Sequence, residues 1–327
     1  MGIGHYIKDI GRGRDGARPL TREHATDLMG QVLDGQVSDL EIGAFCLAMR
    51  IKGETPEEMA GFLDATHARL QHVRADAGTP VVVLPSYNGA RKLPVLTPLL
   101  ACLLAREGVA VVMHGTATEA SRITSEAVLA ALGIQARQTA GSVTAGEVAF
   151  VPTEVLNPAL KRLLDVRRVV NLRNPAHSLV KLMNPVARLS PSPSPSPSAS
   201  TSPEVGSTTQ TPEARTLLVS SYTHPEYALS MAATFELTGA RALLLRGTEG
   251  EVVADARRLP QIDAFVNGTR TPLVEAQAGS LLKLPELPTH IDADSTARYI
   301  QHVLNGQLPV PAPITRQVQA ALQALAL

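Results

Sequence analysis

A short loop between two apolar segments contains residue types that could bind an anion. Residues 81–84 read VVVL, residues 96–108 have the apolar pattern of a helix, and PSYNGARK lies between them. A loop that leads from a strand into a helix presents backbone N–H groups, and such loops often bind phosphate. Arg91 and Lys92 add two cations, yet Gly89 is the loop's one glycine and the loop holds no acid. The loop is therefore either a working phosphate cradle or a cradle that has lost its chemistry and kept its charge.

A second segment, residues 161–188, concentrates positive charge. Its one acid is Asp165, and its basic residues are Lys161, Arg162, Arg167, Arg168, Arg173, Lys181 and Arg188. Because the whole chain has 30 basic and 30 acidic residues, its net charge is zero, and a signal for a polyanion must be local. The pairs at 161/162 and 167/168 are near two helical turns apart and could line one face of a helix.

The elements that must position these residues fall into two parts. Residues 1–75 predict a helical domain, because Ser38 with Glu41 and Thr55 with Glu58 have the spacing of capping boxes. Parts of 151–188, which are helix-like, are expected to join this domain, and its apolar faces are suited to dimerisation. Residues 76–327 predict an α/β domain with a mostly parallel sheet, since strand and helix patterns alternate from residue 80 onward. Within it, the Ser/Pro-rich residues 190–213 are expected to form a disordered insert.

The two groups of cations are expected to meet at one edge of this sheet. Ligands of such folds gather at the carboxyl ends of the strands, where Arg91, Lys92 and Arg122 would join the basic segment. Each cation taken alone is more simply a solvated residue on a helix face. Together they predict a groove for phosphates. No aromatic residues are interleaved with them, so base stacking is not indicated, and phosphate contacts favour binding with little sequence preference.

Composition limits the class of protein. Hydrophobic residues make up 44% of the chain but aromatic residues only 3%, which favours an aliphatic core of helices on a sheet. No apolar run reaches the roughly 18 residues that a membrane span requires, and the N-terminus lacks an apolar signal region. Cys46 and Cys102 lie in apolar helical patterns and are interpreted as buried residues of a reducing compartment. We therefore expect a soluble, cytoplasmic protein without membrane contacts.

Several motifs give the chain a resemblance to a known family. HYIKDIGRGRDGARPLT, SDLEIGAFCLAMRIKGET and the His-Gly after the second strand resemble the anthranilate phosphoribosyltransferase-like family, also called glycosyltransferase family 3. PSYNGARK, HSLVKLMNP, SYTHPEY and GTEGEV are similar to its TrpD2 branch, the YbiB-like DNA-binding proteins. The resemblance implies a nucleoside phosphorylase-type fold and a homodimer formed through the helical domain. It also implies a former substrate cleft, formed by Ser86, Tyr87, Asn88, Gly89, His114, Gly115 and His177.

The enzyme motifs of that family are altered here. Where the enzymes have a GTGGD loop, this chain has Pro85 followed by SYNG, and where they have KHGNR it has MHGTA from Met113 onward. The Asp-Glu pair that holds magnesium aligns with Val252 and Val253. Glu249 and Glu251 lie nearby, and two carboxylates at this spacing are more often a solvated turn than a metal site. Arg173 falls where the enzymes have an arginine that pairs with the anthranilate carboxylate, and His177 falls at a nearby family asparagine.

These observations support two hypotheses from different classes. The first is a non-catalytic homodimer that binds DNA, or another nucleic acid, without sequence specificity through basic grooves at the former cleft. It needs no cofactor, metal or catalytic residue. The alternative is a phosphoribosyltransferase that uses phosphoribosyl pyrophosphate and an aromatic acceptor. Pro85, Met113 and the two valines argue against this enzyme, whereas Arg173 argues for it.

Overall fold

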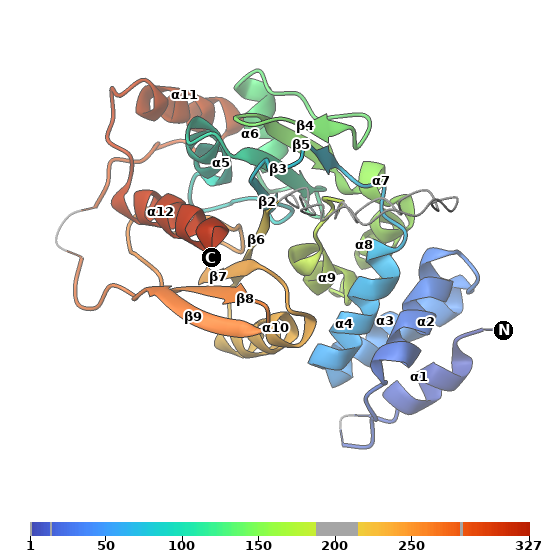
Figure 1. Cartoon of the computed structure of the whole chain (residues 1–327). Coiled ribbons are helices and arrows are strands. Elements are labelled where there is room, and N and C mark those ends of the chain that lie inside the picture. Colours follow the sequence, from blue (N-terminus) through green and yellow to red (C-terminus); the bar gives the residue numbers. More distant parts are fainter. Residues whose placement is uncertain (1, 14, 188–214, 282–283) are drawn as a thin grey trace, which may run out of the picture.

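The computed structural model describes residues 2–13, 15–187, 215–281 and 284–327 (Figure 1). The expected Ser/Pro-rich insert at 190–213 and Arg188 lie outside the described residues. Within the described chain, a helical part lies beside an α/β part whose mostly parallel sheet confirms the expected fold class.

The helical part combines two separate stretches of sequence. It comprises α1 (Gly4–Ile10), α2 (Arg22–Leu33), α3 (Asp39–Lys52), α4 (Pro56–His67), α7 (Thr153–Leu156), α8 (Pro158–Val170) and α9 (Ala176–Leu182). Helix α8 packs on α2 and α3, and α9 packs on α4. Both predicted capping boxes are present, since the side chains of Ser38 and Thr55 accept from the N–H groups of Glu41 and Glu58. These caps fix where α3 and α4 begin, and with them the short turn between the two helices.

The central sheet has seven described strands in the order β5-β3-β2-β6-β7-β8-β9. Their bounds are β2 (Val81–Pro85), β3 (Ala110–Gly115), β5 (Val148–Pro152), β6 (Thr216–Tyr222), β7 (Ala242–Arg246), β8 (Ile262–Val266) and β9 (Thr269–Val274). The first five strands in this order run parallel, and β8 and β9 pair antiparallel at the edge. The short strands β1 (Arg74–Ala75) and β4 (Ser142–Val143) form a second, parallel pair.

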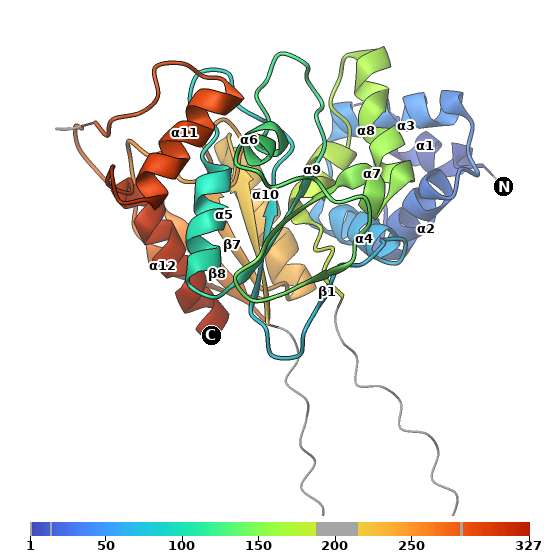
Figure 2. The same ribbon diagram turned by 90° about the horizontal axis from the view of Figure 1, so that it is seen from above.

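The two faces of the sheet pack against different layers (Figure 2). One face is covered by α5 (Thr97–Arg106), α6 (Ser125–Ala131), α11 (Ala293–Leu304) and α12 (Ala312–Ala326). The other is covered by α10 (Pro225–Thr238) and the helical part. Alternate residues of β2 follow this division, because Val82 and Leu84 belong to the first core and Val81 and Val83 to the second. The helical part therefore shares a continuous core with the sheet.

Local patterns identified some elements and missed others. The expected strand at 81–84 corresponds to β2. The apolar runs LLVSSY at 217–222 and RALLLR at 241–246 belong to the expected alternation of strands and helices, and they correspond to β6 and β7. The strand β5 (Val148–Pro152) differs from expectation. Its last two residues, 151 and 152, belong to the segment 151–188, which was expected to be helix-like. A five-residue apolar run such as VAFVP has too few residues for its periodicity to separate a strand from a helix.

A buried ion pair holds the turn between α3 and α4. The Glu58 side chain has no solvent exposure and accepts from the backbone N–H of Leu20 at 2.8 Å and of Thr55 at 2.9 Å. The Lys52 ammonium donates to the same carboxylate at 2.6 Å. The carboxylate therefore links the segment before α2 to both later helices.

We predict that Glu58→Ala lowers the free energy of unfolding by about 3–5 kcal/mol, because it leaves a buried ammonium without its counter-ion and two backbone N–H groups without their acceptor. Urea denaturation measures this loss. The matched control is Asp64→Ala, which removes the half-exposed pair of Asp64 with Arg22 and should cost about 0–1 kcal/mol. Equal losses for the two variants would contradict the structural role of Glu58.

Candidate functional site

Six of the seven predicted cleft residues lie where the parallel strands β2 and β3 end at one edge of the sheet, and His177 lies on α9. Ser86, Tyr87 and Asn88 follow β2 and are almost completely buried, as are His114 and His177. The loop after β2 lies directly against the end of β3, since a Cβ on Gly115 would be 2.0 Å from the Ser86 carbonyl oxygen. This close approach requires glycine at 115. The cleft residues therefore form the floor of the site and leave little surface for a large partner.

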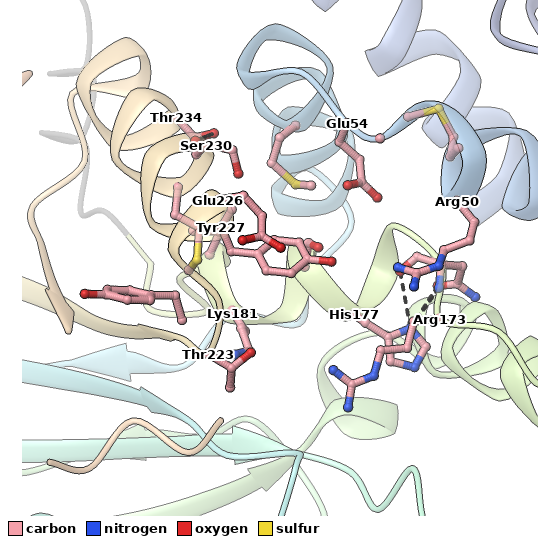
Figure 3. Close-up of a pocket in the computed structure, with 18 of the residues that line it drawn as sticks. Arg50, Glu54, Arg173, His177, Lys181, Thr223, Glu226, Tyr227, Ser230 and Thr234 are labelled. Atoms are coloured by element: carbon pink, nitrogen blue, oxygen red, sulfur yellow. Dashed lines mark hydrogen bonds between the residues drawn. The ribbon is translucent and has the colours of Figure 1, made fainter. Parts of the chain in front are cut away.

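A cavity of about 310 Å³ lies between the helical part and the α/β part (Figure 3). It is lined from α3 and α4 on one side, from α10 on another, and from α9 with the ends of β2 and β6 at its base. Arg173 and Lys181, both predicted site residues, line it, and Figure 3 shows Glu54, Glu226 and Tyr227 around the same space. The cavity has the size and mixed polarity of a small-molecule site.

Burial changes the titration of three predicted site residues. It lowers the pKa of Lys181 to about 8, and the Lys181 ammonium donates to the Ser221 carbonyl oxygen at 2.9 Å. Burial also lowers the pKa of His114 to about 3. The pKa of His177 falls to about 3 through burial and the positive charge of Arg173. Both histidines are therefore neutral at physiological pH and contribute no positive charge. Lys181 is half-buried and faces the cavity.

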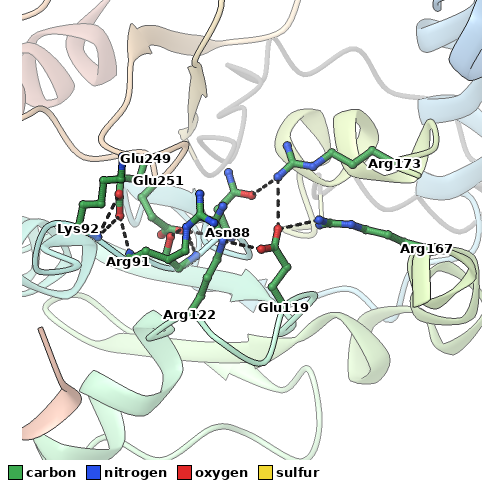
Figure 4. A network of polar contacts seen from close by, with 10 residues as sticks. Asn88, Arg91, Lys92, Glu119, Arg122, Arg167, Arg173, Glu249 and Glu251 are labelled. Carbon is green, nitrogen blue, oxygen red and sulfur yellow. Dashed lines mark hydrogen bonds and ion pairs between the residues drawn. The ribbon is translucent and has the colours of Figure 1, made fainter. Parts of the chain in front are cut away.

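The loop after β2 already binds a carboxylate of its own chain (Figure 4). Glu251 is 1% exposed, and its Oε1 accepts from the N–H groups of Asn88 at 3.0 Å and Gly89 at 2.8 Å. Its Oε2 accepts from the Thr97 hydroxyl at 3.0 Å and also from the Ser86 hydroxyl. The interpretation of this segment as a solvated turn is therefore wrong for Glu251. No local pattern signals these contacts, because the partners are more than 150 positions apart.

The neighbouring Glu249 binds the remainder of the same loop. Its carboxylate accepts from the N–H of Arg91 at 2.6 Å and of Lys92 at 3.1 Å. Arg91 and Lys92 are exposed. Their backbone N–H groups are therefore bound to Glu249, while the residues themselves remain at the surface.

Three of the predicted arginines surround a single acid that sequence reasoning did not identify. Glu119 accepts from Arg167 at 2.7 Å and from Arg122 at 3.1 Å, and the Arg173 guanidinium lies 3.9 Å away (Figure 4). Arg173 also donates to the side-chain oxygen of Asn88 at 3.2 Å. The sequence signal was an acid in the loop after β3, but its partner on α8 is 48 positions away. The structure thus brings these arginines together around their own counter-ion.

The remaining predicted cations are less closely grouped. Lys161 and Arg168 share Asp165 on α8, and the Arg168 side chain is 62% exposed. Arg162 is exposed and faces the end of α2, near Gly35. It therefore does not lie on the same face as Arg167, five residues later on the helix. Arg91, Lys92, Arg122, Arg167, Arg168 and Arg173 form the group at the sheet edge, which we call the basic edge.

Among the described residues, no group of three or more His, Cys, Asp or Glu side chains is arranged to hold a metal ion. No described helix has the length and hydrophobicity to cross a membrane.

Comparisons with known proteins relate the chain to one group of proteins. Residues 5–69 match the model of the glycosyl transferase family helical bundle domain. The chain is 38% identical over 325 residues to the uncharacterized protein YbiB of Escherichia coli (strain K12), covering 97% of this chain and 92% of that protein. It is 31% identical over 170 residues to an anthranilate phosphoribosyltransferase of Anaeromyxobacter sp. (strain Fw109-5), about half of each chain. The anthranilate phosphoribosyltransferase structure from Thermus thermophilus superposes with a TM-score of 0.66, covering 97% of this chain and 87% of that one at 22% identity, and so supports the fold.

The ion pairs of Glu119 predict a pH dependence of stability. Burial alone would raise its pKa, but hydrogen bonds and charges from Arg167 and Arg122 outweigh burial and lower the pKa from 4.5 to about 2. A lowered carboxyl pKa stabilises the fold above the ordinary value, and this stabilisation is lost as the pH falls toward the lowered one. We predict that wild type is more stable than Glu119→Gln by a constant amount at pH 5–7. This difference should shrink between about pH 4.5 and pH 2.

Urea denaturation of both proteins across this pH series measures the difference. A difference that stays constant down to the lowest pH at which both fold would contradict the ionised pairing of Glu119 with the arginines.

Proposed function

Because the chain belongs to the family of Escherichia coli YbiB, within the anthranilate phosphoribosyltransferase superfamily, we propose that it is a non-catalytic nucleic-acid-binding protein. It binds DNA, or another nucleic acid, without sequence specificity, as its resemblance to the DNA-binding TrpD2 branch suggests. The observation that carries this proposal is the basic edge, where six cations from three segments of the chain lie at one edge of the sheet. A cytoplasmic location stays a prediction from sequence.

The chemistry of the basic edge suits phosphate contacts. Arginine presents a planar fork of donors that matches the oxygens of a phosphate. Arg168 and Arg173 are 62% and 41% exposed, and Arg91 and Lys92 are exposed on the adjoining loop. A nucleic-acid phosphate would replace the carboxylates of Glu119 and Asp165 as the partner of Arg173 and Arg168. Such contacts recognise the backbone and carry no base sequence.

Other features argue against catalysis of phosphoribosyl transfer. The N–H groups of Asn88 and Gly89, which would meet a pyrophosphate, are bound to Glu251. Val252 and Val253, at the positions aligned with the magnesium-binding acids of the enzymes, are buried in the apolar core. Phosphoribosyl transfer depends on charged and hydrogen-bonding groups positioned around the diphosphate. Without free N–H groups in the loop and without acids at 252 and 253, the main catalytic contribution is lost.

One observation favours a second function. The cavity between the two parts is lined by Arg173, at the place where the resemblance puts a carboxylate-binding arginine, and it is large enough for an aromatic acceptor. A phosphoribosyltransferase with an altered cradle is therefore the alternative proposal.

The homodimer is part of the proposal and rests on exposed apolar side chains. On α3, Leu40, Leu47 and Ile51 are exposed at spacings of seven and four residues, which place them on one side of the helix. Val169 and Leu172 are exposed at the end of α8, which packs on α3. Such a patch marks an interface more often than a free surface. A dimer through this patch would present two basic edges to one long polyanion.

We predict that Arg168→Ala/Arg173→Ala weakens binding of a double-stranded DNA of arbitrary sequence. In a salt series, the slope of log affinity against log salt should become shallower by about 0.9 for each phosphate that the variant no longer neutralises. Fluorescence anisotropy measures both quantities. The control is Arg298→Ala, an exposed arginine on α11 whose side chain hydrogen-bonds to Ser295 and to no residue of the basic edge, and it should leave both quantities unchanged.

Absence of DNA and RNA binding by wild type at low salt would overturn the proposal. Titration with phosphoribosyl pyrophosphate and magnesium would then test the alternative.

We predict that Leu47→Glu/Ile51→Glu converts a dimer to a monomer, because a dimer would bury both acids in an apolar contact. Sedimentation velocity measures the mass. The matched control is Leu229→Glu, which places an acid at an exposed leucine of α10. A wild-type protein that sediments as a monomer at high concentration would contradict the proposed interface.

A further inference from the structure

We propose that the Glu251 carboxylate is a built-in substitute for a phosphate, which occupies a still-formed anion site in residues 86–89 and excludes external anions from it. This inference goes beyond nucleic-acid binding and does not depend on it. It also revises the idea of a degenerate loop: the loop retains the donors of an anion site, and its own chain supplies the anion.

The donors around Glu251 have the arrangement of an oxyanion site. Two consecutive backbone N–H groups, from Asn88 and Gly89, point to one oxygen at 3.0 and 2.8 Å. Hydroxyls of Thr97 at 3.0 Å, Ser86 and Ser125 at 3.5 Å surround the other oxygen. Gly89 has a φ of 64°, the left-handed conformation that turns successive N–H groups toward one point. Backbone N–H groups and hydroxyls of this kind bind phosphate in other proteins. They donate equally well to a phosphate oxygen and to a carboxylate oxygen.

The turn that carries Glu251 is built to lie against this loop. Gly250 has a φ of 91°, and a Cβ there would lie 1.9 Å from the side-chain nitrogen Nδ2 of Asn88. A Cβ on Gly247 would lie 2.7 Å from the Cβ of Ser221, at the end of β6. The Ser221 hydroxyl also donates to the Gly250 carbonyl oxygen at 3.0 Å. Glycine at both positions lets the turn approach closely enough for the carboxylate to reach the loop.

The same turn leaves few donors of the loop free. Glu251 accepts from residues 88 and 89, and Glu249 accepts from Arg91 and Lys92. The N–H groups of Ser86 and Ala90 donate to the carbonyl oxygens of His114 and Ile123. An external phosphate must therefore displace a tethered carboxylate whose effective concentration is at least about millimolar, and it must enter beside two negative charges. Wild type is thus closed to phosphate at this loop.

The test uses Glu251→Ala, which removes the anion and leaves its donors around an empty space. We predict that inorganic phosphate binds this variant and raises its melting temperature in a saturable way, by about 4 °C at a hundred times its dissociation constant. Wild type at the same ionic strength should show no saturable rise. The matched variant is Glu251→Gln, which refills the space with an amide and should also show no saturable rise. Isothermal titration calorimetry with inorganic phosphate measures the binding directly.

Each outcome decides the proposal. Equal phosphate effects on wild type, Glu251→Ala and Glu251→Gln would overturn it, because the effect would then not belong to this site. Absence of binding to a folded Glu251→Ala would overturn it as well. If Glu251→Ala folds poorly in chloride, recovery of folded protein in phosphate but not in chloride of equal ionic strength supports the proposal, and no recovery contradicts it. DNA binding is not the readout, so these results are separate from those for the basic edge.

Discussion

The Glu251 carboxylate hydrogen-bonds to two consecutive N–H groups after β2, and through its other oxygen it joins further parts of the chain. Thr97 begins α5 and Ser125 begins α6, and both contribute hydroxyls to the same carboxylate. A buried carboxylate must have its hydrogen bonds satisfied, so these segments and the turn after β7 are held in one arrangement. The shape of the carboxyl edge of the sheet, and what can bind there, depends on this set of contacts.

The distribution of charge at that edge explains how a chain of zero net charge can still present cations. Glu119 and Asp165 each bind more than one basic side chain, so the arginines are held in place and partly neutralised in the absence of a partner. In the proposed function, a bound nucleic acid would exchange these contacts for phosphate contacts and would release its own counter-ions. The net gain in binding free energy would be smaller than the number of cations indicates, because a phosphate contact to Arg122, Arg167, Arg168 or Arg173 first breaks an internal ion pair. Binding through such an edge is therefore expected to be strongly dependent on salt.

The sequence predicted features that depend on residues close together in the chain, and it did not predict contacts between distant segments. The starts of α3 and α4 were predictable because a capping box lies within four residues, and β2, β6 and β7 were predictable because each is a compact apolar run. The basic residues were identified by type. The acids that contact them and the loop after β2 were not identified. Glu119 contacts Arg167, and Glu251 contacts Gly89, only after the sheet has brought distant segments together. A glutamate beside a glycine looks like a solvated turn until the loop that it contacts is known.

The two regions at the carboxyl ends of the strands differ in what occupies them. In the loop after β2, an internal carboxylate occupies the backbone donors. Between the helical part and the sheet, a cavity of about 310 Å³ remains, with Lys181 and Arg173 in its lining. Arg173 connects the two regions, because it lines the cavity while its guanidinium donates to Asn88 and faces Glu119. A small ligand in the cavity and a polyanion at the basic edge would both act on this arginine. If both proposals hold, the two kinds of binding would be coupled through this one side chain, although their main contacts are separate.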